Sequence, residues 1–137
     1  VEKVCATIGN AAGIYPDVDD NGTALFRFKS GALGVVEASW VQTGGASGLE
    51  VTGSEGTIYN DQELGYVIGV PGKDPVAVVK ADEKPTRIER LLRAIRGEVP
   101  AGELAEDLQC AADAVAIVEA CYASSEQGAW VDVSRLG

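Results

Sequence analysis

The hydrophobic pattern divides the chain into a strand-rich part followed by a helical part. In residues 23–29 apolar and polar positions alternate, so Phe26 and Phe28 are expected on the face opposite to Leu25 and Arg27. Further runs rich in β-branched residues are separated by glycine, asparagine or proline, which favours short antiparallel connections. The expected strands are residues 1–8, 23–29, 33–41, 49–52, 57–60, 64–70, 76–80 and 130–133.

Two helices are expected in the last third. Thr86 and Glu89 have the spacing of a capping box, and the apolar residues that follow recur at helical intervals until Gly97. A longer helix is expected over residues 103–127, where apolar positions step by three and four, and Gly128 is placed to end it.

The order of these elements predicts an α+β fold: an open, mostly antiparallel mixed sheet with helices packed on one face. A sheet covered on one side only leaves its second face open. Because that face carries valine and tryptophan residues, we expect it to require a partner.

Composition fits a single domain of 137 residues with a net charge of −10 and a pI near 4.3. Such a surface repels a phosphate backbone, so no nucleic-acid partner is expected. No apolar stretch is long enough to span a bilayer and no signal peptide opens the chain, so the prediction is a cytoplasmic protein without a membrane partner. Cys5, Cys110 and Cys121 lack a CxxC pattern, and we expect them to be small core residues in a reducing compartment.

The one basic cluster comprises Arg87, Arg90, Arg93 and Arg96, whose spacing of three places them along one side of a helix. A solvated helix face is the commoner origin of such a row. A site for phosphate or for an acidic partner is the alternative.

The usual catalytic side chains are missing. Without histidine, Ser-His-Asp and Cys-His nucleophile systems are excluded. The glycine-rich turn 53–56 is not a nucleotide-binding motif, because it lies between two strands. Glu37 is either a buried carboxylate or, more commonly, an outward-facing sheet residue. Trp40 could stack on a sugar or close an interface, but is more commonly a core residue. An acidic loop carries part of a calcium-loop pattern, although a polar loop is the commoner origin: Asp17, Asp19, Asp20 and Asn21.

Several segments together resemble the C-terminal domain of Gfo/Idh/MocA oxidoreductases, the relatives of glucose-fructose oxidoreductase and inositol dehydrogenase. Residues 19–34, DDNGTALFRFKSGALG, are similar to the family's D-D-…-F-x-x-G-a-l-G signature, and Glu37 to Trp40 match the next strand. Residues 49–58, LEVTGSEGTI, resemble its l-E-v-x-G-t-e-G-t-l hairpin. Residues 93–98 and the helix to Gly128 resemble the family's tail, so the resemblance extends over most of the chain.

This resemblance implies a fold like the C-terminal domain of dihydrodipicolinate reductase and an enzyme acting on a sugar, polyol or related small molecule. NAD or NADP would be bound by an N-terminal Rossmann domain that is absent from this chain, which would begin just after the family's Asp/His helix. Residues 1–137 would then form one substrate and oligomerisation domain, pairing with another subunit through the exposed sheet face. No catalytic, cofactor-binding or metal residue is assigned, and the substrate-binding residues are not identified. Lys84 lies in an E-K-P triplet, but far from the family's position, and receives no role.

A second interpretation is a standalone carbohydrate-binding or dimerisation module without enzymatic activity. In that case Trp40, Trp130 and the acidic loop would bind a sugar.

Overall fold

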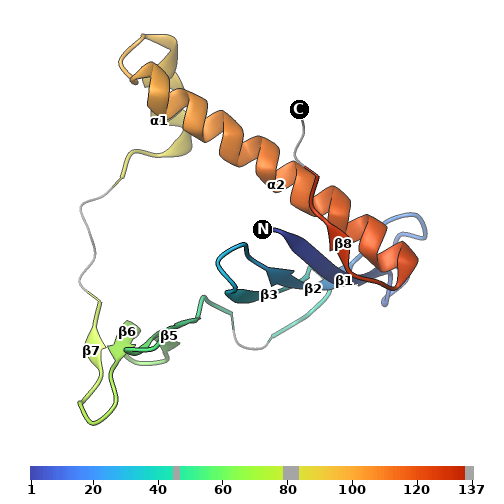
Figure 1. Cartoon of the computed structure of the whole chain (residues 1–137), viewed down its shortest axis with the longest axis horizontal. Coiled ribbons are helices and arrows are strands. Elements are labelled where there is room, and N and C mark those ends of the chain that lie inside the picture. The colour runs from blue at the N-terminus through green and yellow to red at the C-terminus, as the bar shows by residue number, and fades with distance from the viewer. Residues whose placement is uncertain (45–46, 79–83, 135–137) are drawn as a thin grey trace. The chain divides into compact units, whose positions relative to one another are not determined.

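A computed structural model describes residues 1–44, 47–78 and 84–134. The chain divides into two compact units, one formed by Val1–Thr43 with Arg90–Gly137 and the other by Gly44–Glu89. Each unit is described by itself (Figure 1).

The first unit contains a four-stranded sheet in the order β3-β2-β1-β8. Its strands are β1 (Lys3–Gly9), β2 (Asn21–Arg27), β3 (Leu33–Ser39) and the short β8 (Val131–Asp132). Each pair is antiparallel. The β2–β3 connection is the tight hairpin expected from the sequence, closed by a 2.9 Å hydrogen bond from the Phe28 N–H to the Ala32 carbonyl.

The helix α2 (Ala101–Gln127) covers one face of this sheet, lying over β1 and β8 (Figure 1). The register pairs Val4 with Phe26 and Phe26 with Gly34, so these positions share the helix-facing side. Leu25 pairs with Val35 and lies on the opposite side. The predicted alternation along this strand is confirmed.

The core lies where α2 packs on β1. Val4, Ala24, Ala120 and Cys121 form one buried cluster, and Phe26 and Ile117 are among the half-buried residues around it. Small residues on the buried side of α2 allow the helix backbone to approach the sheet closely. The helix therefore packs against β1 and β8, while β3 remains beyond it on the same face.

Two serines of α2 replace a missing strand at the edge of β1. Strand β8 pairs with β1 only at Lys3 and Val4, so later N–H groups on that edge need other acceptors. The Ala6 N–H donates to Ser124 Oγ and the Ile8 N–H donates to Ser125 Oγ, each at 2.9 Å. Ser124 is fully buried. The helix thus protects an edge that would otherwise be open.

The second unit is an antiparallel sheet in the order β4-β5-β6-β7. Its strands are β4 (Val51–Thr52), β5 (Thr57–Asp61), β6 (Gly65–Gly69) and β7 (Val76–Ala77). Glycine is required at the β4–β5 turn, because a Cβ atom at Gly56 would lie 2.5 Å from the Gly69 carbonyl oxygen. The last part of the predicted strand 76–80, residues 79 and 80, lies outside the described residues.

The start of α1 (Arg87–Ile95) and the end of α2 follow local signals, whereas α2 begins at Ala101, two residues before the predicted start, where Pro100 makes no side-chain cap hydrogen bond. Helix α1 begins with the expected capping box: the Thr86 N–H donates to Glu89 Oε2 at 2.7 Å, and the Glu89 N–H donates to Thr86 Oγ1 at 3.2 Å. The α2 helix ends at Gly128, which adopts φ +62° and donates its N–H to the Ser124 carbonyl.

The α+β class with largely antiparallel pairing is confirmed, with differences in detail. The strands form two separate sheets instead of one, since β4 pairs with β5 and not with β3. Every pair among the described strands is antiparallel, so the parallel pairing expected in a mixed sheet is not observed among them. Cys121 is buried as predicted and Cys5 is half-buried, but Cys110 is exposed, contrary to the prediction, because it lies in the N-terminal part of α2, residues 101–111, which is exposed on all sides.

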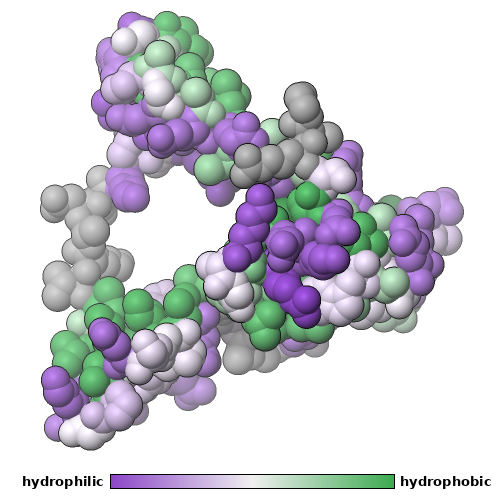
Figure 2. Space-filling view, in the orientation of Figure 1, coloured by the Kyte–Doolittle hydropathy of each residue, from purple (hydrophilic) through white to green (hydrophobic). Residues whose placement is uncertain are grey.

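The apolar stripe of α1 is also exposed in this chain. Leu91 and Ile95 are 60% and 74% exposed, and Figure 2 shows hydrophobic surface in the region of α1. No helix in the described ranges is long and apolar enough to cross a membrane.

Candidate functional site

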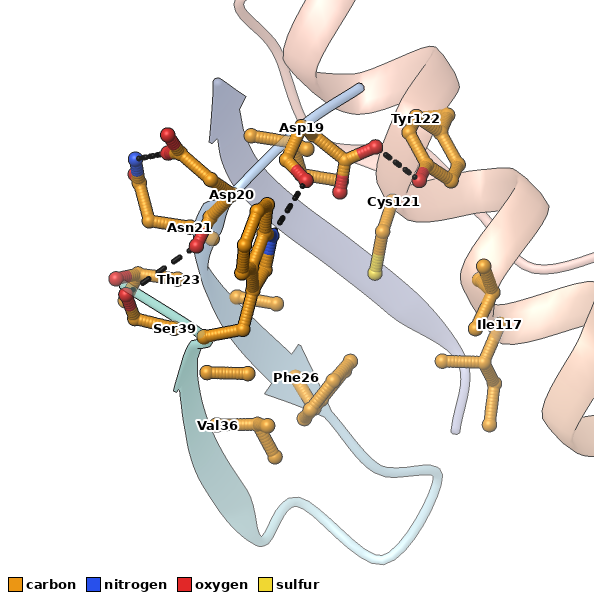
Figure 3. A pocket seen from close by; sticks show the side chains of 16 residues that line it. Asp19, Asp20, Asn21, Thr23, Phe26, Val36, Ser39, Ile117, Cys121 and Tyr122 are labelled. Carbon is orange, nitrogen blue, oxygen red and sulfur yellow. Dashed lines mark hydrogen bonds between the residues drawn. The ribbon is translucent and has the colours of Figure 1, made fainter. Parts of the chain in front are cut away.

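A pocket of about 470 Å³ opens in the first unit between α2 and strands β2 and β3 (Figure 3). It exists because α2 leaves the outer half of its sheet face uncovered. Its floor is apolar and comes from both sides: Ala24, Phe26 and Val36 from the strands, and Ile117 and Cys121 from the helix. The volume lies within the range of about 300–1,000 Å³ that is typical of small-molecule sites.

Polar groups gather at one end of this pocket, where the loop before β2 meets the end of β3. The Tyr122 hydroxyl donates a hydrogen bond of 2.9 Å to Asp19 Oδ1 and so joins residues 103 positions apart (Figure 3). The other oxygen of this carboxylate, Oδ2, has no hydrogen-bond partner among the described residues. Asp19 is exposed and can therefore accept hydrogen bonds from a ligand.

Trp40 stands beside Asp19 and is held in a fixed orientation. Its indole Nε1–H donates to the Asp19 backbone carbonyl at 3.1 Å, and its ring stacks on Tyr15 with centroids 5.7 Å apart. The side chain is 53% exposed and lines the pocket. The prediction that Trp40 is a core residue is therefore wrong. It follows the last residue of β3, an edge strand that α2 does not reach, so nothing in this unit buries it.

The neighbouring Asp20 holds the acidic loop together. It is only 2% exposed, and its two carboxylate oxygens accept the N–H groups of Ala11 and Ala12, each at 2.7 Å. The Asn21 side-chain amide donates to it as well. Burial by itself raises the pKa of the Asp20 carboxyl, but these hydrogen bonds outweigh it and lower that pKa below its ordinary value.

This network favours the polar-loop interpretation of the acidic loop. Because the Asp20 carboxylate is occupied by backbone donors, it is a structural group of a polar loop rather than an open metal ligand. Across the described ranges, no group of three or more acidic, cysteine or histidine side chains converges as a set of metal ligands.

The other titratable groups of the pocket are perturbed by their neighbours. The hydrogen bond to Asp19, and then the negative charge of that residue, raise the pKa of the Tyr122 hydroxyl. Burial raises the pKa of the Cys121 thiol, so this sulfur stays protonated and inert at neutral pH. Neither group is prepared to act as a nucleophile or base.

The structure separates the remaining candidates from this pocket. Glu37 is exposed, in agreement with the commoner alternative for it. Trp130 is not among the residues that line the pocket, and the Arg27 guanidinium lies 5.1 Å from the centroid of its ring. The sugar site that would combine Trp40 with Trp130 is therefore not formed.

The basic row also has a structural explanation. Arg90 Nε lies 2.7 Å from Asp107 and Arg90 Nη2 lies 3.5 Å from Glu103, so this side chain ties α1 to α2. Arg93 pairs with Glu98 at 3.8 Å. These pairs favour the solvated helix face over a phosphate site. Lys84 is exposed.

Sequence reasoning did not identify Tyr15 or the partnership of Asp19 with Tyr122. The sequence places Asp19 in the acidic loop and at the start of the D-D signature, and Tyr122 at an apolar step of the long helix. No local signal connects two residues so far apart in the chain, since only the packing of α2 on the sheet brings them together.

The fold of the chain is one that occurs within NAD-binding oxidoreductases. A structure titled as an NAD-binding protein from Listeria innocua matches 96% of this chain with a TM-score of 0.73 and 21% identity. Levoglucosan dehydrogenase in complex with NADH and levoglucosan matches 98% of it with a TM-score of 0.67 and 21% identity. An oxidoreductase from Agrobacterium radiobacter, in complex with NAD+, L-tartaric acid and magnesium, matches 97% of it with a TM-score of 0.63 and 21% identity.

Residues 1–59 match the family model described as the GFO/IDH/MocA C-terminal domain. The resemblance stated from the sequence is thereby confirmed. The chain spans less than half of the three matched structures, covering 41%, 45% and 43% of their respective lengths. No curated protein sequence matches it significantly.

Proposed function

We propose that this chain is the substrate and oligomerisation domain of an NAD(P)-dependent oxidoreductase acting on a sugar, polyol or related small molecule. The observation that carries the proposal is the family match over residues 1–59, together with a fold shared along nearly the whole chain with NADH-bound and NAD+-bound oxidoreductases. Both compact units belong to this one domain. We place the parent protein in the cytoplasm, a reducing compartment that suits the free thiols of Cys5, Cys110 and Cys121.

The division of labour follows from the chemistry of the pocket. The described residues of the pocket provide an apolar floor, an aromatic surface and one accessible carboxylate. The hydride is exchanged with NAD or NADP, which a separate N-terminal Rossmann domain of the same polypeptide binds. This chain contributes one wall of the substrate site and is not catalytic alone.

The open face of the first sheet is the proposed oligomer contact. Leu33 and Val35 are 74% and 67% exposed on β3, and Leu25 is 43% exposed beside them on β2. A second copy that covers this face would remove adjacent apolar side chains from water. A stable pair requires about 1,600 Å² of total buried surface, and face-to-face sheet packing can provide it.

Nicotinamide binding tests the proposal. The polypeptide encoded by the complete reading frame and the 137-residue chain should be purified and titrated with NADH and NADPH, using the change in nicotinamide fluorescence. We expect the complete polypeptide to bind one of them saturably and the 137-residue chain to bind neither. Tight binding by the 137-residue chain, or a complete polypeptide that binds neither cofactor, would contradict the proposal.

The second candidate is a standalone carbohydrate-binding module. It is favoured by one observation, the exposed and immobilised Trp40 beside Asp19. A complete polypeptide that binds sugars but neither nicotinamide would support this candidate over the oxidoreductase.

A further inference from the structure

The polar end of the pocket between α2 and strands β2 and β3 carries a negative charge that no neighbouring cation balances. The charged residues that line this pocket are Asp19 and Asp20, and its lining contains no lysine or arginine. No lysine or arginine of the described ranges forms an ion pair with either carboxylate. Asp20 is compensated by the N–H groups of Ala11 and Ala12, at 2.7 Å each. The charge of Asp19 is therefore available to a ligand.

The Asp19 carboxylate is held in place and is open to a ligand. The Tyr122 hydroxyl donates to Oδ1 at 2.9 Å, so the carboxylate is anchored to α2 (Figure 3). Oδ2 accepts no hydrogen bond from the described residues, and the side chain is exposed. The Tyr122 oxygen, which donates its proton to Asp19, can still accept a hydrogen bond itself. This pair of residues therefore offers a ligand two acceptors, Asp19 Oδ2 and the Tyr122 oxygen.

Trp40 adds an aromatic surface beside this carboxylate. Its indole N–H donates to the Asp19 backbone carbonyl at 3.1 Å, and its ring stacks on Tyr15 with centroids 5.7 Å apart. These two contacts fix a ring that is still 53% exposed. A surface that is ordered before the ligand arrives lowers the entropic cost of binding. Among aromatic side chains, the indole has the ring face that attracts a cation most strongly.

We propose that Asp19, Trp40 and Tyr122 form a binding site for a protonated primary amine. The ammonium group donates a charge-assisted hydrogen bond to Asp19 Oδ2 and a second hydrogen bond to the Tyr122 oxygen. The face of the Trp40 ring stabilises its positive charge. An uncharged hydroxyl group gains neither the attraction of opposite charges nor the cation–π contact, and an anion is repelled by Asp19. The site therefore selects for positive charge.

The apolar floor defines the rest of the ligand. Phe26, Val36 and Ile117 line the pocket beyond its polar end (Figure 3). The amine is therefore carried by a ring or a short chain that turns an apolar side towards these residues, and a pocket of about 470 Å³ has room for one. The net charge of −10 on the chain also attracts cations to its surface. The ligand class is a small organic amine with an apolar or weakly polar body.

This inference goes beyond the proposed function, which requires no charge on the ligand. Amine binding needs no nicotinamide and can be measured on the 137-residue chain. Only a role of the amine as part of a substrate rests on the proposed function. In that role, the site predicts that an aminated substrate is bound more tightly than its counterpart with a hydroxyl group at the same position.

Three ring compounds of similar size separate charge from shape. Cyclohexylamine is protonated at pH 7, as a lysine side chain is, whereas cyclohexanol is neutral and cyclohexanecarboxylate is an anion. The chain has two tryptophans, so its NMR spectrum contains two indole N–H signals. We expect cyclohexylamine to shift the Trp40 signal saturably, cyclohexanol to bind about tenfold more weakly, and the carboxylate to cause no saturable shift. Trp130 is the internal control, because it does not line the pocket and the Arg27 guanidinium already lies 5.1 Å from the centroid of its ring.

Variants assign the selectivity to named groups. Asp19→Asn keeps an acceptor for the Tyr122 hydroxyl but removes the charge, so cyclohexylamine and cyclohexanol should then bind with similar affinities. Tyr122→Phe releases the carboxylate without removing it and should weaken amine binding by a smaller factor. The matched control is Asp17→Asn, which removes the same charge from the same loop at a residue that does not line the pocket. It should retain the preference for the amine.

The outcomes separate this proposal from the proposed function. The amine site would be overturned by equal affinities of cyclohexylamine and cyclohexanol for the parent chain. It would also be overturned if the amine caused no saturable shift up to about 100 mM, well above a dissociation constant of about 1 mM, or if the preference for the amine persisted in Asp19→Asn. Each of these results is compatible with nicotinamide binding by the complete polypeptide, so the two proposals can fail separately. The comparison of ligands on the parent chain needs no variant and decides the matter if Asp19→Asn does not fold.

Discussion

The hydroxyl of Tyr122 donates to the carboxylate of Asp19 at 2.9 Å and thereby joins α2 to the loop before β2 across 103 positions of the chain. This contact closes one end of the pocket and orients the carboxylate there. Because Tyr122 must be protonated to donate, the bond favours its neutral form and raises its pKa.

Removing Asp19 should therefore lower the pKa of Tyr122 towards its ordinary value near 10. We expect Asp19→Asn to shift the phenolate transition of this tyrosine to lower pH, because the charge that opposes the phenolate is lost. The transition can be followed by NMR of a ring-labelled tyrosine. An unchanged transition in Asp19→Asn would show that the contact does not persist in solution.

Asp20 should make the chain sensitive to acid. Its pKa in the folded state lies below its ordinary value of 3.8, so the protonated carboxyl is more abundant in the unfolded chain. Its contribution to the free energy of unfolding is fully present above about pH 4 and is lost as the pH falls through the lower, folded-state value. The midpoint of urea unfolding should therefore fall steeply below pH 4.

The variant Asp20→Asn isolates this contribution. It should lower the urea midpoint at pH 7, and the difference from the parent chain should shrink as the pH falls below 4. Asp17→Asn provides the matched loss of charge in the same loop and should leave the midpoint at pH 7 nearly unchanged. A difference between Asp20→Asn and the parent that stays constant from pH 7 to pH 2.5 would contradict the assignment.

Ser124→Ala should destabilise the first unit. The Ser124 hydroxyl accepts the Ala6 N–H at 2.9 Å and donates to the Ala129 carbonyl at 2.6 Å, and the residue is fully buried. Alanine leaves both backbone groups without a partner, so we expect a loss of about 1–3 kcal/mol in the free energy of unfolding. Chemical denaturation measures it.

Ser125→Ala is the matched control for that change. Ser125 makes the equivalent bond to the Ile8 N–H but is only half-buried, so water can replace its hydroxyl. We expect a loss below that of Ser124→Ala, about 0.5–1.5 kcal/mol. Equal losses for the two variants would show that burial does not distinguish them.

Gly56→Ala should disrupt the second unit. The added Cβ would lie 2.5 Å from the Gly69 carbonyl oxygen, a backbone atom that cannot move away without disturbing the β5–β6 pairing. Overpacking of this kind costs about 1–3 kcal/mol. Amide hydrogen exchange at Ile58 and Ile68 should accelerate. Gly53→Ala, at the other end of the same turn, meets its nearest atom at 3.9 Å and should have a much smaller effect.

Local signals made the secondary structure predictable. The capping box of Thr86 and Glu89 predicts where α1 begins, and Gly128 predicts where α2 ends, because both signals act through bonds within a few residues. The start of α2 at Ala101 has no such signal. The alternation of Leu25 and Phe26 likewise predicts which face each side chain takes.

Long-range packing was not predictable in the same way. The exposure of Trp40 depends on α2 stopping short of β3. The division into two sheets depends on β3 and β4 not pairing with each other, whereas the hairpin of β4 and β5 is predicted by its glycine-rich turn. The polar end of the pocket could be predicted only in part: the acidic loop was visible, while its pairing with Tyr122 results from tertiary contacts for which the sequence carries no local pattern.

The most direct test of the account is nicotinamide-dependent turnover by the polypeptide of the complete reading frame, measured as absorbance of NADH or NADPH with a panel of sugars and cyclic polyols. We predict oxidation of at least one of these substrates, with a lower kcat/KM in Asp19→Asn and an unchanged value in Asp17→Asn. Absence of turnover with every member of the panel and with both cofactors would contradict the assignment of this chain to a sugar or polyol oxidoreductase.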